Sequence, residues 1–378
     1  MSLINRIPLY KRIEKLRDCP LITYITSTRP NAQGQMAMDA IPEILDQVLA
    51  LPTDCKAVDL FLVSLGGDPT VAWRIMTLLR DHVKKVGVII PQSAYSAATL
   101  LALGADEIVM HPCANLGPVD PQIQVKRKSV GGSIPEVISF GSEDLAGFLA
   151  YVRDNVGLSD QEYLKATFEM FCNEVGAIPI GMAARSARLS LQLGTKLLQM
   201  HMKGEAAKQK ALAIASTLNK EFFHHGYPVG RKEAKDIGLK VVEPHKELEK
   251  EIWALWEDIE TELDCRHPFN PMLLIEEHGA TKDLFAPVPL IHLPSNLPPQ
   301  LAQQVFQQIL AQITTVQIPP VEYSIESALV ESLRLASVFQ TKGQIFARRD
   351  WETKISLNNV VISSQWEKVH MSTQLPSN

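Results

Sequence analysis

Apolar runs and amphipathic segments alternate along the first 265 residues, and their order predicts strands followed by helices. Uninterrupted apolar, β-branched runs are typical of strands buried on both faces. Segments with apolar positions three or four residues apart are typical of amphipathic helices. We expect strands at residues 20–26, 57–63, 86–91 and 107–110, and helices at residues 38–51, 72–83 and 97–103. This alternation predicts an α/β fold with a largely parallel sheet.

The pattern changes after this first part. Residues 122–142 contain Lys126, Lys128 and two adjacent glycines and read as a mobile loop. Helix-capping residues then predict two helices that end before Gly157 and Gly176, and a long helical region broken at Gly194 and Gly204. A helix ending at Gly238, a short strand at residues 239–242 and a charged helix at residues 247–264 complete this part.

A cluster of prolines after Cys265 marks a boundary. We therefore divide the chain into an N-terminal arm (residues 1–19), a core (20–265) and an α+β C-terminal region (266–378) that serves assembly or partner binding. In this last region we predict helices at residues 301–313 and 325–339, and a hairpin turn around Asn358 and Asn359.

The composition narrows the class of protein. Apolar residues make up 46% of the chain and charged residues 21%, as in soluble globular proteins. The net charge of −5 argues against a dedicated nucleic-acid binder. Five scattered cysteines without a C-x-x-C pair indicate neither a disulfide framework nor a zinc site, and the N-terminus lacks a secretory signal. We expect a cytoplasmic protein without an integral membrane segment.

Candidate chemistry lies in two turns that each join a buried strand to a helix. Gly66 and Gly67 follow the strand at residues 57–63, and Ser96 precedes the small residues Ala97 and Ala98. A serine hydroxyl close to unobstructed main-chain amides suits acyl transfer, in which the amides stabilise an oxyanion. Common nucleotide, zinc-protease and α/β-hydrolase motifs are absent from the sequence, and no cofactor is indicated.

The segments VDLFLVSLGGDPTVAWRIMTLLR, VIIPQSAYSAATLLALGADEIVMHPCANLGPVDPQ and HGYPVGRKEAKDIGLKVV carry a family resemblance. Together they resemble the Clp/crotonase superfamily, in particular the SDH (serine dehydrogenase proteinase) family related to signal peptide peptidase A. The resemblance covers roughly residues 20–265. It implies a right-handed spiral of ββα units, assembly into homo-oligomers, and a serine peptidase acting on a peptide or protein substrate.

By this resemblance Ser96 is the nucleophile, and the amides of Gly67 and Ala97 form the oxyanion hole. Ser93 is an alternative nucleophile if the turn shifts by three residues. As isolated features, the glycine pair could be a tight turn and Ser96 a small residue at a helix start.

The general base is less clear. Clp proteases place a histidine about 25 residues after the serine, where this chain has Val119 and Asp120. Enzymes similar to signal peptide peptidase A use a lysine, and Lys165 is the best match, although it could simply form an i,i+4 pair with Glu169. Lys126 and Lys128 are alternatives. Arg153 occupies the lysine position of a related archaeal group and cannot act as a base, because arginine stays protonated.

Other polar residues have simpler interpretations. Asp68 is expected to cap the following helix, Asp120 to orient a polar partner or stabilise its turn, and His111 to be a structural histidine. The adjacent residues His224 and His225 do not form a convincing metal pair, because neighbours on regular structure point apart.

Three functions are compatible with these features. We expect a serine peptidase of the Ser–Lys type, with Ser96 as nucleophile and Lys165 as base. A catalytically inactive assembly or scaffold protein of the same fold is the first alternative, and a lyase or hydratase acting on a small substrate such as serine is the second. A membrane-protein substrate or partner is compatible with any of them.

Overall fold

The computed structural model describes residues 3–128, 135–222, 224–278, 281–286, 292–293, 298–314, 316–350 and 354–369. At its centre is a mixed sheet whose first part is parallel, as the alternating pattern predicts. Helices connect its strands, because a parallel neighbour can be reached only by a crossover. The parallel strands are β1 (Leu21–Thr26), β2 (Ala57–Val63), β3 (Lys85–Ile90), β5 (Glu107–Met110) and β9 (Val241–Val242), in that spatial order. The predicted α/β class is confirmed.

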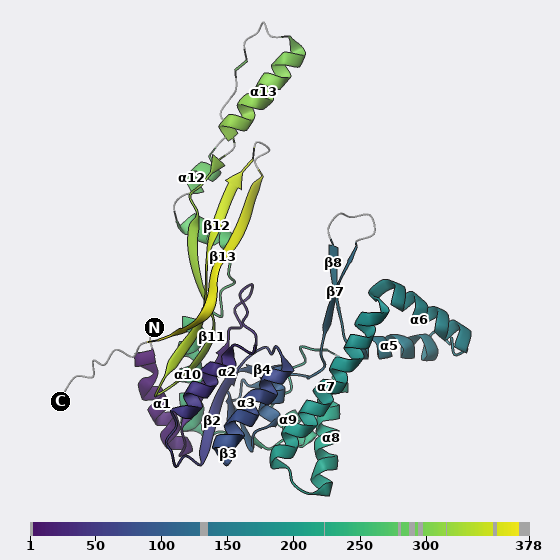
Figure 1. Cartoon of the computed structure of the whole chain (residues 1–378), viewed down its shortest axis with the longest axis vertical. Coiled ribbons are helices and arrows are strands. Elements are labelled where there is room, and N and C mark those ends of the chain that lie inside the picture. Colours follow the sequence, from purple (N-terminus) through teal and green to yellow (C-terminus); the bar gives the residue numbers. More distant parts are fainter. Residues whose placement is uncertain are drawn as a thin grey trace, which may run out of the picture.

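Both faces of this sheet are covered by helices, and alternate residues of each strand point to opposite faces. Ile22 and Tyr24 of β1 belong to one buried cluster, whereas Leu21 and Ile25 belong to another. The first face packs against α2 (Ala40–Leu49), α3 (Pro69–His82), α4 (Ala97–Leu103), α7 (Ala177–His201), α8 (Glu205–Lys220) and α9 (Arg231–Ile237). The second face packs against α1 (Leu3–Arg17) and α10 (Lys246–Glu262). The result is a three-layer core, which Figure 1 shows at the base of the molecule.

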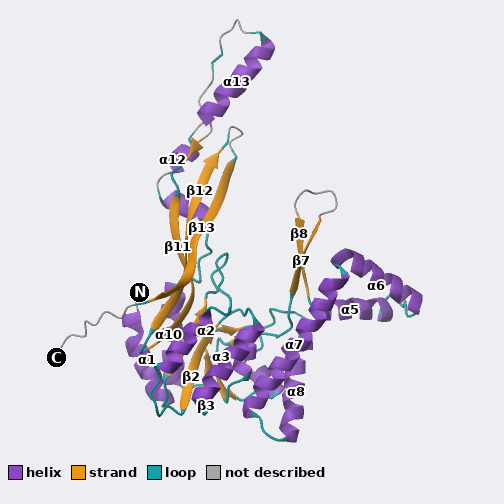
Figure 2. Ribbon diagram, viewed as in Figure 1, coloured by secondary structure: helices purple, strands orange, loops and turns teal. Residues whose placement is uncertain are grey.

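The C-terminal region continues the same sheet. Its long strand β11 (Val321–Ser332) pairs antiparallel with β1, and β12 (Ala336–Arg349) pairs with β11. β13 (Ile355–Lys368) and the short β10 (Val316–Gln317) both pair with β12. Figure 2 shows β11, β12 and β13 rising from the core, with α13 (Pro299–Thr314) beyond them. The helices α11 (Pro271–Glu277) and α12 (Thr281–Leu284) lie along this extension. One sheet therefore spans residue 265, where the sequence suggests a boundary.

Two expectations for the C-terminal region are wrong. The segment around residues 325–339 is not a helix, because it forms most of β11, the turn that follows and the start of β12. Asn358 and Asn359 do not form a turn either; they pair with Phe346 and Ile345 in the middle of β13. The polar residues of β11 alternate with apolar ones at period two, which outweighs the apolar positions at helical spacing.

Two expectations for the middle of the chain need revision. Residues 122–142 contain a two-stranded ribbon of β7 (Ile123–Lys128) and β8 (Pro135–Phe140) rather than only a loop. The two predicted helices are present as α5 (Ser142–Asp154) and α6 (Gln161–Val175), and Asp160 caps α6. α7 (Ala177–His201) continues through Gly194 instead of breaking there. The glycine allows α7 to pack closely against α4, since a Cβ at this position would lie 3.3 Å from the Leu100 side chain.

A buried ionic cluster fixes the N-terminal arm to the rest of the protein. Arg6 of α1 donates to both carboxylate oxygens of Glu331 in β11, at 2.8 and 2.7 Å. It also pairs with Asp258 and Glu262 of α10, and Tyr10 donates to Glu331 at 2.7 Å. The Arg6 and Glu331 side chains are almost fully buried, so removal of either would leave a charge without its main partner.

Candidate active site

The two glycine and serine turns meet in space as the sequence predicts. The short strand β4 (Ser93–Ala94) runs parallel to the end of β2: the Ser64 amide donates to the Ser93 carbonyl, and the Tyr95 amide donates to the Ser64 carbonyl. On its other side, β4 pairs with β6 (Asn115–Leu116). The turn that carries Ser96 therefore lies beside the turn that carries Gly66 and Gly67.

Contacts around Gly66 explain why this position requires glycine. Gly66 has φ +107°, a conformation that side chains strongly disfavour, and a Cβ there would lie 2.8 Å from the Ser96 Cβ. Its amide donates to the Ser64 hydroxyl at 3.0 Å, and that hydroxyl accepts a second bond from Thr26. The Gly66 main chain is thus held directly against Ser96.

Ser96 itself has an unusual backbone conformation, with φ 53° and ψ −116° immediately before α4. A non-glycine residue with positive φ is uncommon and is retained only where the surrounding structure enforces it. Thr99 supplies part of that support, because its hydroxyl lies within hydrogen-bond distance of the carbonyl oxygens of Ala94 and Gly117, at 2.7 and 2.8 Å. The residue is partly exposed at a strand-to-helix turn, as a nucleophilic serine must be.

Two amides near Ser96 are available to bind an anion. In the described part of the chain, neither the Gly67 amide nor the Ala97 amide donates a hydrogen bond to another residue. Gly67 has φ +146° and is exposed, whereas Ala97 is buried at the first position of α4. The oxyanion role of these two amides remains a prediction.

The predicted base, Lys165, does not lie near Ser96 within one copy of the chain. Its side chain on α6 is 77% exposed and pairs with Glu169 at 3.7 Å, which matches the simpler interpretation of this residue. α5 and α6 form an arm at the end of α7, well away from β4 (Figure 1). Arg153 lies on the same arm and pairs with Asp154 at 2.6 Å.

The remaining sequence candidates are also placed. Lys126 is exposed on β7, the Lys128 side chain lies outside the described residues, and the Ser93 hydroxyl donates to Gln92 at 2.9 Å. The His111 ring stacks on Trp253, with ring centroids 4.9 Å apart, and burial lowers its pKa. The Asp68 carboxylate accepts from the Thr70 amide and caps α3 as expected.

An acid–base pair that the sequence does not predict joins Asp120 to His225. His225 Nδ1 is 2.8 Å from Asp120 Oδ1, and their side chains are 37% and 15% exposed. The Asp120 hydrogen bond raises the pKa of His225 above its usual value. Because the carboxylate accepts at Nδ1, the Nε2 atom of the neutral ring is the proton acceptor.

Strand pairing relates this pair to Ser96. Ala94 pairs with Leu116 in parallel, and Leu116 pairs with Val229 in antiparallel fashion. The chain that leads to Ser96 therefore runs in the same direction as the chain that leads to Asp120, and His225 lies opposite Asp120 on the third segment. The sequence holds no signal for this pairing, because residues 120 and 225 meet only once the register of Leu116 and Val229 is known.

Among the described residues, no cluster of three His, Cys, Asp or Glu side chains could hold a metal ion. In the same part of the chain, no helix combines the length and the apolar character needed to span a bilayer.

Comparison with known proteins bears on the region around Ser96. Residues 5–139 match the family model described as ClpP-like SDH-type serine proteinase. Two proteins of Methanocaldococcus jannaschii, both described as uncharacterized, are similar over most of their length. MJ0137 is 25% identical over 73% of this chain and 87% of its own, and MJ1495 is 29% identical over 63% of this chain and 72% of its own.

A solved structure, the S97A mutant of the 1510-N membrane-bound stomatin-specific protease, shares 16% identity over 57% of this chain and 79% of its own. The TM-score is 0.33, a value at which the likeness adds nothing on fold or function. The family match, in contrast, includes both turns of the candidate site and confirms the resemblance to the ClpP-like SDH proteinases.

Proposed function

We propose that this chain, whose residues 5–139 match the ClpP-like SDH-type serine proteinases, is a serine peptidase that uses Ser96 as its nucleophile. The observation that supports this role best is the positive φ of Ser96, held at a strand-to-helix turn by the Gly66 main chain. Backbone strain of this kind costs of order 1–3 kcal/mol and is concentrated at functional sites.

In the proposed mechanism, the Ser96 hydroxyl attacks the carbonyl carbon of the scissile peptide bond. The amides of Gly67 and Ala97 donate to the oxyanion that forms, and each such donor typically contributes about 3–4 kcal/mol to transition-state stabilisation. The general base takes the Ser96 proton and passes it to the leaving amine as the C–N bond breaks, which leaves a covalent acyl-enzyme. Water then attacks the ester, releases the acid and restores the Ser96 hydroxyl.

Two groups compete for the role of general base. Lys165 would have to act on the Ser96 of another copy, and its ammonium would have to lose its proton through burial there, because the side chain is exposed in one copy. His225 is favoured as a base within one copy, since it contacts Asp120, and the segments that continue from the paired residues Ala94, Leu116 and Val229 carry Ser96, Asp120 and His225. We therefore propose the His225 and Asp120 pair as the proton acceptor, with Lys165 as the alternative.

Peptide hydrolysis tests the proposed function. With a mixed library of unstructured peptides, the wild type should cleave and Ser96→Ala should lose at least 1,000-fold in rate, whereas Ser93→Ala should retain activity. If Ser93→Ala loses activity and Ser96→Ala keeps it, the nucleophile is Ser93 and the proposed role of Ser96 is wrong. No cleavage by the wild type at any concentration would instead favour the assembly or scaffold function.

A further inference from the structure

The C-terminal strand β13 is an open edge of the large sheet. It pairs with β12 along its whole length, from Ile355 opposite Arg349 to Lys368 opposite Ser337. In the described residues, no strand pairs with its other side, so that side presents a row of free backbone donors and acceptors. Edges of this kind are templates for a further strand.

The usual protections of an edge strand are mostly missing here. Natural edges are short or carry lysine, proline or inward-pointing charges. β13 has 14 residues, contains no proline, and has no charged side chain between Ile355 and Trp366. A single bulge at Ile362 interrupts its pairing with β12.

The same strand exposes several large apolar side chains. Every residue from Ser356 to Ile362 is exposed. Four of them are large and apolar, namely Leu357, Val360, Val361 and Ile362. An exposed, long and apolar edge strand is typical of a strand that pairs with another chain.

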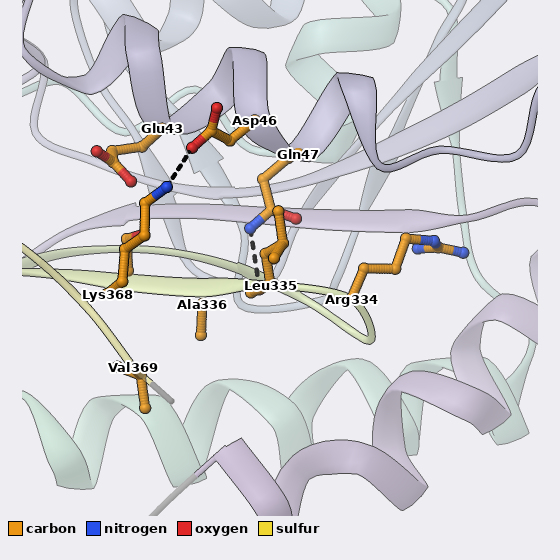
Figure 3. Close-up of a pocket in the computed structure, with 9 residues that line it drawn as sticks. Glu43, Asp46, Gln47, Arg334, Leu335, Ala336, Lys368 and Val369 are labelled. Atoms are coloured by element: carbon orange, nitrogen blue, oxygen red, sulfur yellow. Dashed lines mark hydrogen bonds and ion pairs between the residues drawn. The ribbon is translucent and has the colours of Figure 1, made fainter. Parts of the chain in front are cut away.

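β13 is also held in position before any partner binds. Trp366 donates to Asp39 at 2.9 Å, and Lys368 donates to Asp46 of α2 at 2.7 Å. Figure 3 shows the Lys368 and Asp46 contact at the seam between α2 and the end of β13. A strand fixed in this way loses little conformational entropy on pairing, which favours binding.

We propose that β13 pairs with β13 of a second copy of this chain, antiparallel, about a two-fold axis between Val360 and Val361. The charged residues at the strand ends favour this partner and this direction. Antiparallel pairing places Lys354 of one copy opposite Glu367 of the other, which also pairs with Lys342 of its own chain at 2.9 Å, whereas in-register parallel pairing would place like charges opposite each other at both strand ends. The pairing is isologous and closed, so it produces a dimer rather than a fibre.

Hydrogen exchange of β13, read by mass spectrometry at rising protein concentration, tests this interface. Backbone amides of residues 355–366 should exchange at least tenfold more slowly at high concentration, and light scattering should show the molar mass doubling over the same range. Val361→Lys should remove both effects, because it places two lysines at the two-fold axis. Val137→Lys is the matched control: Val137 is 54% exposed on β8, compared with 55% for Val361 on β13.

Leu357→Lys provides a second variant in case Val361→Lys lowers expression. The proposal is wrong if the exchange rate of β13 does not depend on protein concentration and if Val361→Lys and the wild type have the same molar mass. Protection that appears only when a peptide is added would overturn it too, since the occupant would then be the peptide. Because none of these measurements involves Ser96, their outcome is independent of peptidase activity.

Discussion

The Gly66 main chain packs closely against Ser96: a methyl group on Gly66 would lie 2.8 Å from the Ser96 Cβ and 2.9 Å from the Tyr95 carbonyl oxygen. Gly66→Ala should therefore displace the Ser96 turn as well as strain its own positive φ. We expect a loss of about 1–3 kcal/mol in unfolding free energy, measured by urea denaturation. Because a small displacement of a nucleophile is costly, the peptidase rate should fall by about 100-fold or more.

Gly147→Ala is the control for this substitution. Gly147 lies inside α5, and a Cβ there would meet no atom within 4 Å. Alanine should stabilise this helix by about 0.5–1 kcal/mol and leave the rate unchanged. Full activity in Gly66→Ala would show that the contact does not position Ser96.

The strain at Ser96 gives a second prediction. Glycine accepts a positive φ at low cost, so Ser96→Gly should be more stable than Ser96→Ala by about 1 kcal/mol, although both variants lose the hydroxyl. Thermal denaturation of the two inactive variants measures this difference. Equal or reversed stabilities would mean that the backbone at residue 96 is not strained in solution.

The pair of His225 and Asp120 predicts the pH dependence of the reaction. A general base must be neutral, so the rate constant kcat/KM should rise as pH passes through the pKa of His225. Asp120 is the charged side chain that faces His225 in the described residues, and it raises this pKa, so the midpoint should lie above 6.5. Measurement of kcat/KM from pH 5 to 9 gives the midpoint.

Asp120→Asn should move that midpoint down, because the amide no longer stabilises the charged imidazolium, and His225→Gln should remove the transition. Lys165→Met distinguishes the alternative base. If this variant loses activity while His225→Gln keeps the wild-type profile, the lysine is the base and the histidine pair is structural.

The buried cluster around Arg6 gives a stability prediction. Glu331→Gln keeps the shape of the side chain but removes the main charge opposite Arg6, so it should lower the unfolding free energy by about 3 kcal/mol or more. Glu169→Gln removes the partner of Lys165 on an exposed helix and should have no measurable effect. Urea denaturation of both variants, at constant pH, makes the comparison. If Glu331→Gln leaves the unfolding free energy unchanged, Asp258 and Glu262 are sufficient to compensate the charge of Arg6.

The core and the position of Ser96 were predictable from the sequence because both depend on local patterns. Buried strands such as β2 and β3 are continuous apolar runs, and the turns at Gly66 and Ser96 follow them directly. The C-terminal strands were harder to predict: the apolar residues of β11 fit two periods, and only its pairing with β1 selects the strand. Asn358 and Asn359 resemble a turn locally, yet they lie inside β13, where they pair with Phe346 and Ile345 of β12.

The candidate acid–base pair of Asp120 and His225 could not be predicted, because it depends on a contact between distant residues. Asp120 and His225 are 105 residues apart, and each has an ordinary local interpretation. Lys165 fits a family pattern in sequence, but its place on the exposed arm depends on how α5, α6 and α7 pack.

Covalent labelling of the wild type with a fluorophosphonate, followed by peptide mass spectrometry, tests the central claim most directly. We predict one adduct per chain, on Ser96, that forms faster as pH rises and is absent from Ser96→Ala. An adduct on a different residue, or none under conditions in which the protein is folded, would contradict the assignment of Ser96 as a nucleophile.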